Sequence, residues 1–205
     1  APRDAWMHAD DAFVRSERPT EAHYFHVSGR ASVELPAGTA KVEVMKGFDY
    51  EFEQREVTVT AGKPVTLTVQ LKPLPALPGA GRLVSGDVHV HMNYGGWYRN
   101  TPQKMLQQAR AEGLNIVHNL IVNKEQRVPD VAYFTGKPDS ASTSDYLLLH
   151  AQEFHTSYWG HVGLLNLTEH LLIPDYSGYP GTAAASLSPT NTVVAQQARR
   201  QKGLM

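Results

Sequence analysis

The stretch Leu114-Asn-Ile-Val-His-Asn-Leu-Ile-Val122 decides the fold of the second half of the chain, because it is nearly continuous in apolar residues. Runs of this kind are typical of strands buried on both faces of a parallel sheet. A strand-like segment at 83–91 precedes it, and Thr101-Pro102 begins a helix that ends at Gly113. Strand, helix and strand in this order predict a βαβ unit.

Three further segments extend this pattern towards the C-terminus. Residues 146–154 read as a second buried strand, residues 161–167 as its neighbour and residues 190–203 as a helix. Residues 82–205 are therefore predicted to be an α/β domain. Because another strand would normally follow the last helix, we expect this domain to be incomplete at its C-terminus.

The first half of the chain has a different periodicity. Apolar and polar residues alternate there in short runs separated by Gly- and Pro-containing turns, which is typical of half-buried antiparallel strands. The runs lie at 31–35, 40–44, 56–59 and 65–69. We predict an antiparallel β-sandwich over 23–72, an N-terminal segment at 1–22 compatible with a short helix, and a Pro/Gly linker at 73–81. The predicted fold class is a two-domain α+β protein.

The composition excludes several functions. The 205 residues include 19 Lys and Arg against 20 Asp and Glu, which gives a net charge of −1 and argues against binding nucleic acid or an anionic membrane. No apolar run approaches the roughly 20 residues of a membrane helix. The chain has no Cys, so any metal ion must be held by His and carboxylate side chains. The absence of a G-x-S-x-G motif disfavours a serine hydrolase.

The chain begins at Ala1. This start fits a processed signal peptide and fits trimming equally well, so location is left open with a lean to the periplasm or secretion. The expected partner is a small-molecule substrate, and the sequence gives no indication of the oligomeric state.

His89-Val90-His91 is the first candidate for chemistry. Residues i and i+2 of a strand point to the same face, so both imidazoles can converge on one metal ion. The same motif also occurs as two surface histidines or as a hydrogen-bonded pair.

A second group of polar residues lies in and after the predicted strand at 146–154. Glu153, His155 and His161 supply the nitrogen and oxygen donors that zinc, manganese or iron favours in the absence of thiolates. A loop stabilised by Glu–His hydrogen bonds is the alternative. Taken with the His89/His91 pair, the group favours a metal site, in which Glu153 is the candidate bridge between two ions.

The run from Ser85 to His91, together with Gln152-Glu-Phe-His and Gly160-His-Val-Gly-Leu, resembles the PHP-domain metallohydrolases of the CehA/McbA (carbaryl-hydrolase-like) type. The resemblance covers about residues 82–205 and implies a distorted β/α barrel of which this chain holds the opening units. The N-terminal β-sandwich is similar to carboxypeptidase-regulatory-like or transthyretin-like modules.

The resemblance also implies a set of site residues. The metal ligands would be His89, His91, Glu153 and His161, which would hold one to three divalent ions (Zn, Mn or Fe). His155, by its place beside Glu153, is expected to support the ligands or to carry a proton in catalysis, and direct metal ligation is the alternative. Glu153 is expected to take part in catalysis as well as in metal binding. Many PHP phosphoesterases carry acidic or histidine ligands near the positions of Asn93 and Asn123, and these departures argue against a complete trinuclear phosphatase site.

Other residues near these motifs are candidates for supporting roles. Asp87 shares the strand phase of the histidine pair and is expected to lie behind the ligands as a supporting acid. Tyr94, Trp97 and Tyr158 could line a pocket for an aryl ester, carbamate or amide, and Lys124 could bind substrate. Ordinary packing and a solvated loop are the alternatives for these four residues.

The predicted function is a metal-dependent hydrolase that uses metal-activated water on an ester, carbamate, amide or phosphoester. One alternative is a PHP-class phosphoesterase. The other is a non-catalytic module that binds metal or a partner protein. Two further histidines, His118 and His150, interrupt apolar strands and are predicted to be hydrogen-bonded core residues.

Overall fold

The computed structural model describes residues 6–7, 25–79, 81–93, 99–123, 128–172 and 185–205. The chain divides into two compact units, which are described separately. The N-terminal unit comprises residues 1–85 and 107–114, and the C-terminal unit comprises residues 86–106 and 115–205. The expected helix in the N-terminal segment falls almost wholly outside the described residues.

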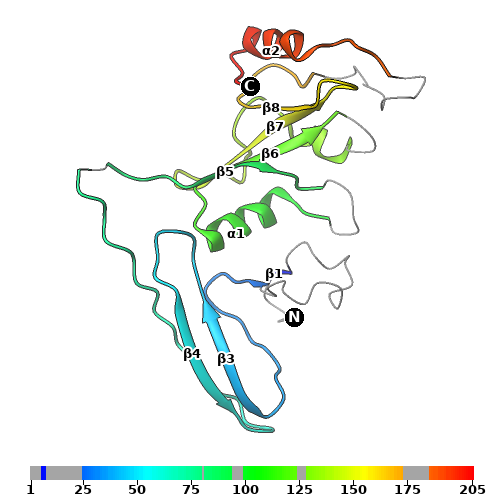
Figure 1. The fold of residues 1–205 in the computed structure, drawn as a ribbon. Helices are drawn as coiled ribbons and strands as arrows, with labels where there is room; N and C mark the ends of the chain where they lie inside the picture. The colour runs from blue at the N-terminus through cyan, green and yellow to red at the C-terminus, as the bar shows by residue number, and fades with distance from the viewer. Residues whose placement is uncertain (1–5, 8–24, 80, 94–98, 124–127, 173–184) are drawn as a thin grey trace. The chain divides into compact units, whose positions relative to one another are not determined.

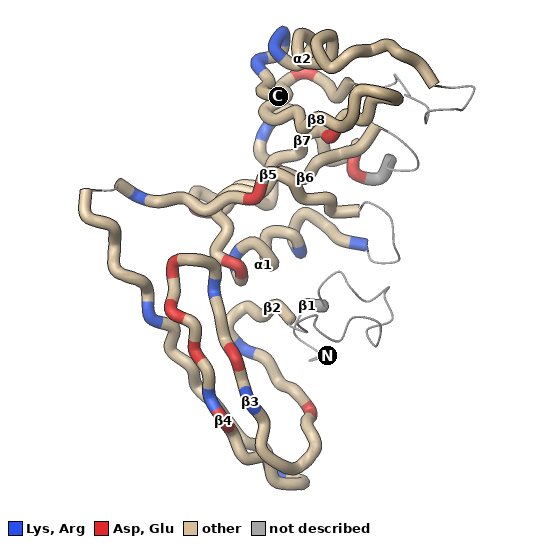
Figure 2. The backbone as a smooth tube through the Cα atoms, in the orientation of Figure 1, with Lys and Arg blue, Asp and Glu red and all other residues tan. Residues whose placement is uncertain are grey.

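The N-terminal unit contains two small antiparallel sheets. Strand β1 (Trp6–Met7) pairs with β2 (Phe25–His26), and β3 (Gly38–Val44) pairs along its whole length with β4 (Glu53–Val59) (Figure 1). The antiparallel pairing that the alternating pattern predicted is confirmed. Basic and acidic residues both occur along β3 and β4 (Figure 2), which is the composition of strands with a solvated face.

The predicted strands at 31–35 and 65–69 are wrong, because neither segment is a strand in the structure. Period-two alternation favours extended backbone, but a strand also needs a partner for its ladder of hydrogen bonds. Val33 and Val65 are accordingly exposed. Among the described residues the unit is a pair of two-stranded sheets, and the second layer of the predicted β-sandwich is not seen.

The predicted βαβ arrangement is confirmed. Strand β5 (Gly86–Val90) and strand β6 (Ile116–Val122) are parallel, and helix α1 (Pro102–Glu112) connects them. The Thr101 hydroxyl accepts a hydrogen bond from the backbone N–H of Lys104 at the helix N-terminus. After the helix, Gly113 has a φ of 71°, a left-handed conformation that commonly ends helices.

Strands β7 (Leu147–His155) and β8 (His161–Leu164) complete a four-stranded mixed sheet in the order β5-β6-β7-β8. Strand β7 is parallel to β6, whereas β8 is antiparallel to β7. A 3₁₀ helix, η3 (Val128–Tyr133), follows β6, and α2 (Asn191–Arg200) lies near the C-terminus. As a consequence, the carboxyl ends of β5, β6 and β7 and the start of β8 all lie at one edge of the sheet.

The core of this unit lies between the sheet and α2. The apolar residues that form it come from β6, β7, β8, α2 and the segment between β8 and α2. They are Ile121, Phe154, Leu164, Leu167, Leu171, Leu172, Val194 and Ala198. This core holds β7 rigidly, so residues at its carboxyl end have fixed positions. No helix in the described part of the chain combines the length and apolarity needed to cross a membrane.

We expect Leu148→Ala to lower the free energy of unfolding by about 2–5 kcal/mol, because Leu148 is completely buried in β7 and its loss leaves a cavity. Urea denaturation followed by circular dichroism measures the change. Leu187→Ala is the matched control, since Leu187 is 64% exposed, and should change stability by less than about 0.5 kcal/mol. Equal effects of the two substitutions would contradict the burial of Leu148 in the sheet.

His118 lies half-buried in β6, and its buried Nδ1 has no hydrogen-bond partner among the described residues. The hydrogen bond predicted for this histidine is therefore not seen at that atom. His150 does meet the prediction, because its Nε2 lies 2.9 Å from Asp139 Oδ2. Burial lowers the pKa of His118 below its ordinary value of 6.5.

A depressed histidine pKa means that the unfolded chain binds the proton more tightly than the folded chain. His118 should therefore cost stability as the pH falls below 6.5, and cost nothing above that value. When the pH falls from about 7.5 to about 5.5, we expect the free energy of unfolding to decrease less in the His118→Gln protein than in the wild type. Urea midpoints of the metal-free proteins at both pH values test this, and equal losses would refute it.

Candidate metal centre

Four histidines and one glutamate meet at the edge of the sheet where β5, β6 and β7 end. His89 lies in β5 and His91 directly follows that strand, Glu153 and His155 end β7, and His161 begins β8. Parallel pairing places the ends of β5 and β7 on the same side of the sheet, and the antiparallel β8 returns to it. The topology therefore brings together residues that are up to 72 positions apart in the sequence.

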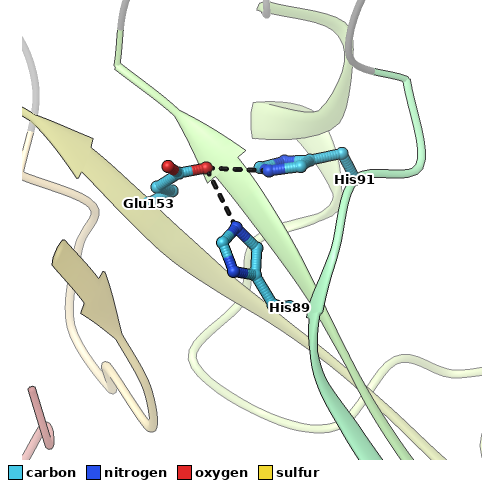
Figure 3. A group of neighbouring side chains, drawn as sticks. All are labelled: His89, His91 and Glu153. Atoms are coloured by element: carbon cyan, nitrogen blue, oxygen red, sulfur yellow. Dashed lines mark hydrogen bonds and ion pairs between the residues drawn. The ribbon is translucent and has the colours of Figure 1, made fainter. Parts of the chain in front are cut away.

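His89 and His91 both face the same oxygen of Glu153. Their Nε2 atoms lie 3.3 Å and 2.7 Å from Glu153 Oε2, respectively (Figure 3). The β5–β6 register shifts by one residue between Asp87 and Val90, an irregularity of the ladder in the segment that contains His89. The two imidazoles thus converge on one carboxylate oxygen, and we call these three residues the first trio.

His155 and His161 face the other oxygen of the same carboxylate. His155 Nε2 lies 3.1 Å and His161 Nδ1 lies 2.8 Å from Glu153 Oε1. The two imidazole rings are stacked, with centroids 3.4 Å apart and planes within 9° of parallel. Together with Glu153 they form the second trio.

The charge of Glu153 is stabilised by its surroundings. Only 9% of its side chain is exposed, and burial by itself raises the pKa of a carboxyl group. The attraction of His155 and His91 and the hydrogen bonds from His89 and His161 act in the opposite direction, and they outweigh burial. The pKa of Glu153 is therefore lowered below its ordinary value of 4.5, and the carboxylate is ionised at neutral pH.

His91 has a defined tautomer. Its Nδ1 lies 2.8 Å from the backbone carbonyl of Leu120, an acceptor only, so Nδ1 carries the proton and donates it. Nε2, the atom that faces Glu153, is therefore the nitrogen whose lone pair could bind a metal ion. A carbonyl acceptor behind one ring nitrogen is the usual arrangement of a metal-ligating histidine.

The residues of both trios fit a divalent cation. The ligand atoms within each trio lie within 4.8 Å of one another, and all are imidazole nitrogens or carboxylate oxygens. This is the donor set of zinc and other first-row ions in sites that lack cysteine. The same contacts are also reasonable Glu–His ion pairs, the alternative that the sequence left open.

The remaining predicted site residues are Asp87, Tyr158, Tyr94, Trp97 and Lys124, and the structure describes the first two. The Asp87 carboxylate accepts a hydrogen bond from the backbone N–H of His89, so it contacts the main chain of that residue. Tyr158 is 48% exposed on the turn between His155 and His161. Tyr94, Trp97 and Lys124 lie outside the described residues.

Two asparagines outside the predicted ligand set, Asn119 and Asn123, contact the backbone of the site. Asn119 accepts from the N–H of Met92, and Asn123 bonds both backbone groups of His155. The signal for Asn119 was a polar amide inside the apolar run 114–122, which is costly unless the amide is fully hydrogen-bonded.

The fold and the cluster define a mixed α/β protein with a His/Glu site that can bind a divalent metal ion. A scan against models of known families, a search of curated proteins and a search of solved structures each find no match to this chain.

We expect the purified protein to bind zinc or manganese and Glu153→Gln to lose nearly all of it, because one carboxylate serves both trios. Elemental analysis after dialysis measures the metal content. Glu169→Gln, a change of the same type at an exposed position of the same unit, should retain the wild-type content. Equal metal contents in all three proteins would contradict this assignment.

Proposed function

We propose that the protein is a metal-dependent hydrolase, and that its C-terminal unit is the opening part of a PHP-like β/α barrel. The main support for the proposal is that the two oxygens of one carboxylate each face a different pair of imidazoles. Glu153 Oε2 faces the first pair and Oε1 faces the second. A bridging carboxylate with nitrogen ligands on either side is suited to two divalent ions.

When bound, a divalent cation supplies Lewis-acid polarisation of a carbonyl or phosphoryl oxygen and acidifies water to a pKa of about 7. The residues of the chain set the conditions for this chemistry. Glu153 keeps its negative charge because its pKa is lowered. His91 donates a hydrogen bond from Nδ1 to the Leu120 carbonyl, which leaves Nε2 as the nitrogen available to a metal ion.

The geometry supports His155 as a ligand in preference to a proton carrier, because its Nε2 lies at the same carboxylate oxygen as the His161 nitrogen. Two trios support two ions within the predicted range of one to three. Three nitrogen and oxygen donors per ion with an open position is the pattern of catalytic zinc sites, so zinc is the first metal to test.

The turn between His155 and His161 supports an aromatic or apolar substrate. Tyr158 and Trp159 lie on it, and 48% and 47% of their surfaces are exposed. The Trp159 indole donates to the Leu187 carbonyl at 2.8 Å, and the Asn191 amide donates to the Trp159 carbonyl at 2.7 Å. The turn is thus anchored, and in the sequence it lies between two of the proposed ligands.

Asn93 and Asn123 stand near positions where many PHP phosphoesterases carry metal ligands. Their contacts favour hydrolysis of a carboxyl ester, carbamate or amide over hydrolysis of a phosphoester. Asn93 donates to Asp130 at 2.6 Å and accepts from the N–H of Asn100, and Asn123 bonds His155. Both amides are thus engaged in hydrogen bonds within the protein. Additional ligands at these positions, which a trinuclear phosphatase site would use, are absent from the described residues.

The zinc- or manganese-loaded protein should hydrolyse p-nitrophenyl acetate and an aryl N-methylcarbamate in preference to p-nitrophenyl phosphate, with release of the phenol as the readout. A chelator should abolish hydrolysis. Glu153→Gln should lower kcat/KM by at least about 100-fold, since it removes the charge shared by both trios. Glu169→Gln is again the control.

Two outcomes would replace this proposal. Preference for the phosphoester would identify the phosphoesterase alternative. Stoichiometric metal without turnover of any of the three substrates would identify a non-catalytic metal-binding module.

A further inference from the structure

Strand β6 lies between the two strands that carry most of the proposed ligands, yet it contributes none itself. Its carboxyl end nevertheless contacts both neighbours through side chains. Asn119 lies within β6 and Asn123 directly follows it, four positions later. Each of these amides bonds the backbone at or beside a different proposed ligand.

Asn119 and its neighbour Leu120 hold His91 from two directions. The Asn119 side chain is completely buried, and its Oδ1 accepts from the backbone N–H of Met92 at 2.9 Å. Met92 is the residue after His91, so this bond fixes the main chain that carries the imidazole. The Leu120 carbonyl accepts from His91 Nδ1 at 2.8 Å and fixes the ring itself.

The Asn119 amide is in turn held by a buried network. Its Nδ2 donates to Asp130 Oδ2 and to His150 Nδ1, both at 3.2 Å. Because His150 Nδ1 faces a donor, the proton of the neutral ring is on Nε2, which donates to Asp139 at 2.9 Å. With its oxygen and nitrogen both engaged, the amide has one orientation only.

Asn123 holds His155 by both of its backbone groups. Its Oδ1 accepts from the His155 N–H at 2.7 Å, and its Nδ2 donates to the His155 carbonyl at 3.2 Å. The last β6–β7 pair is Val122 with Glu153, so this side chain continues the ladder past the end of β6. An amide suits this task, because it combines a donor and an acceptor in one planar group.

We propose that Asn119 and Asn123 are positioning residues, and that each fixes a different trio: Asn119 the first trio through His91, and Asn123 the second through His155. The proposal rests on the metal-binding function proposed above. It assigns to β6 and the residue that follows it separate control over the two halves of the site, since the hydrogen bonds described above join the two amides to different residues.

Full-length proteins that retain one trio each can separate the two effects. His161→Ala retains the first trio, and His89→Ala/His91→Ala retains the second. Zinc affinity is measured by competition with a chromophoric chelator, and the cobalt absorption spectrum reports the geometry of the retained ligands.

In the His161→Ala protein, Asn119→Ala should weaken zinc binding roughly 10–100-fold, the range typical of residues that orient ligands, and Asn123→Ala should leave it within about threefold. In the His89→Ala/His91→Ala protein, Asn123→Ala should weaken zinc binding roughly 10–100-fold, and Asn119→Ala should leave it within about threefold. The cobalt spectrum should change only where the affinity does.

Asn115→Ala is the matched control. The Asn115 side chain also donates to a backbone carbonyl, that of Asp145 at 3.0 Å, but it does so at the opposite end of β6. It should change neither affinity. Thermal unfolding of the metal-free proteins accompanies each titration, because a purely structural role would lower stability and affect both trios alike.

If Asn119→Ala does not fold, the Asn123 substitution decides the proposal alone, because Asn123 lies past the end of the strand. Equal effects on both trios, or effects on neither in parent proteins that bind zinc, would overturn the positioning roles and leave the metal site intact. Folded parent proteins that bind no zinc would overturn the proposed metal function together with this inference.

Discussion

The carboxylate of Glu153 is the charge around which the sheet edge is organised. A nearly buried carboxylate is costly unless it is paired and hydrogen-bonded. One positive charge is enough to neutralise it, yet four imidazoles lie within 3.3 Å of its two oxygens. The cluster therefore contains more nitrogen donors than an ion pair requires. An excess of nitrogen donors around one anionic oxygen pair is the arrangement that a divalent cation can use.

Sheet topology makes this cluster possible. Strands β5, β6 and β7 are parallel, so their carboxyl ends share one edge, and β8 returns to that edge from the end of β7. The apolar core behind β7 fixes Phe154, which separates Glu153 from His155 in the sequence and points to the opposite face. Because successive side chains of a strand point to opposite faces, Phe154 anchors the strand in the core while Glu153 and His155 lie together on the other face.

The sequence predicted the parts of this design that depend on local periodicity. The apolar run 114–122, the helix beginning after Thr101 and the His89/His91 pair each carry their own signal, and the structure contains all three. Features that depend on a partner elsewhere in the chain were not predictable. Alternation at 31–35 does not say whether a neighbouring strand exists, and a single Asn119 in an apolar strand does not say which backbone group it will bond. The phase of Asp87 indicated a face, but its carboxylate caps the backbone of His89 instead.

Burial divides each trio into a fixed member and an accessible one. His91 and His155 have side chains that are 22% and 6% exposed, and both are held by β6, one through the Leu120 carbonyl and one through Asn123. His89 and His161 are 61% and 55% exposed. A cation that approaches the edge would meet an exposed imidazole first and then the fixed imidazole and the carboxylate behind it. In the proposed metal centre, the fixed members would set the geometry of the ligands, and the accessible members would provide the route by which a cation enters.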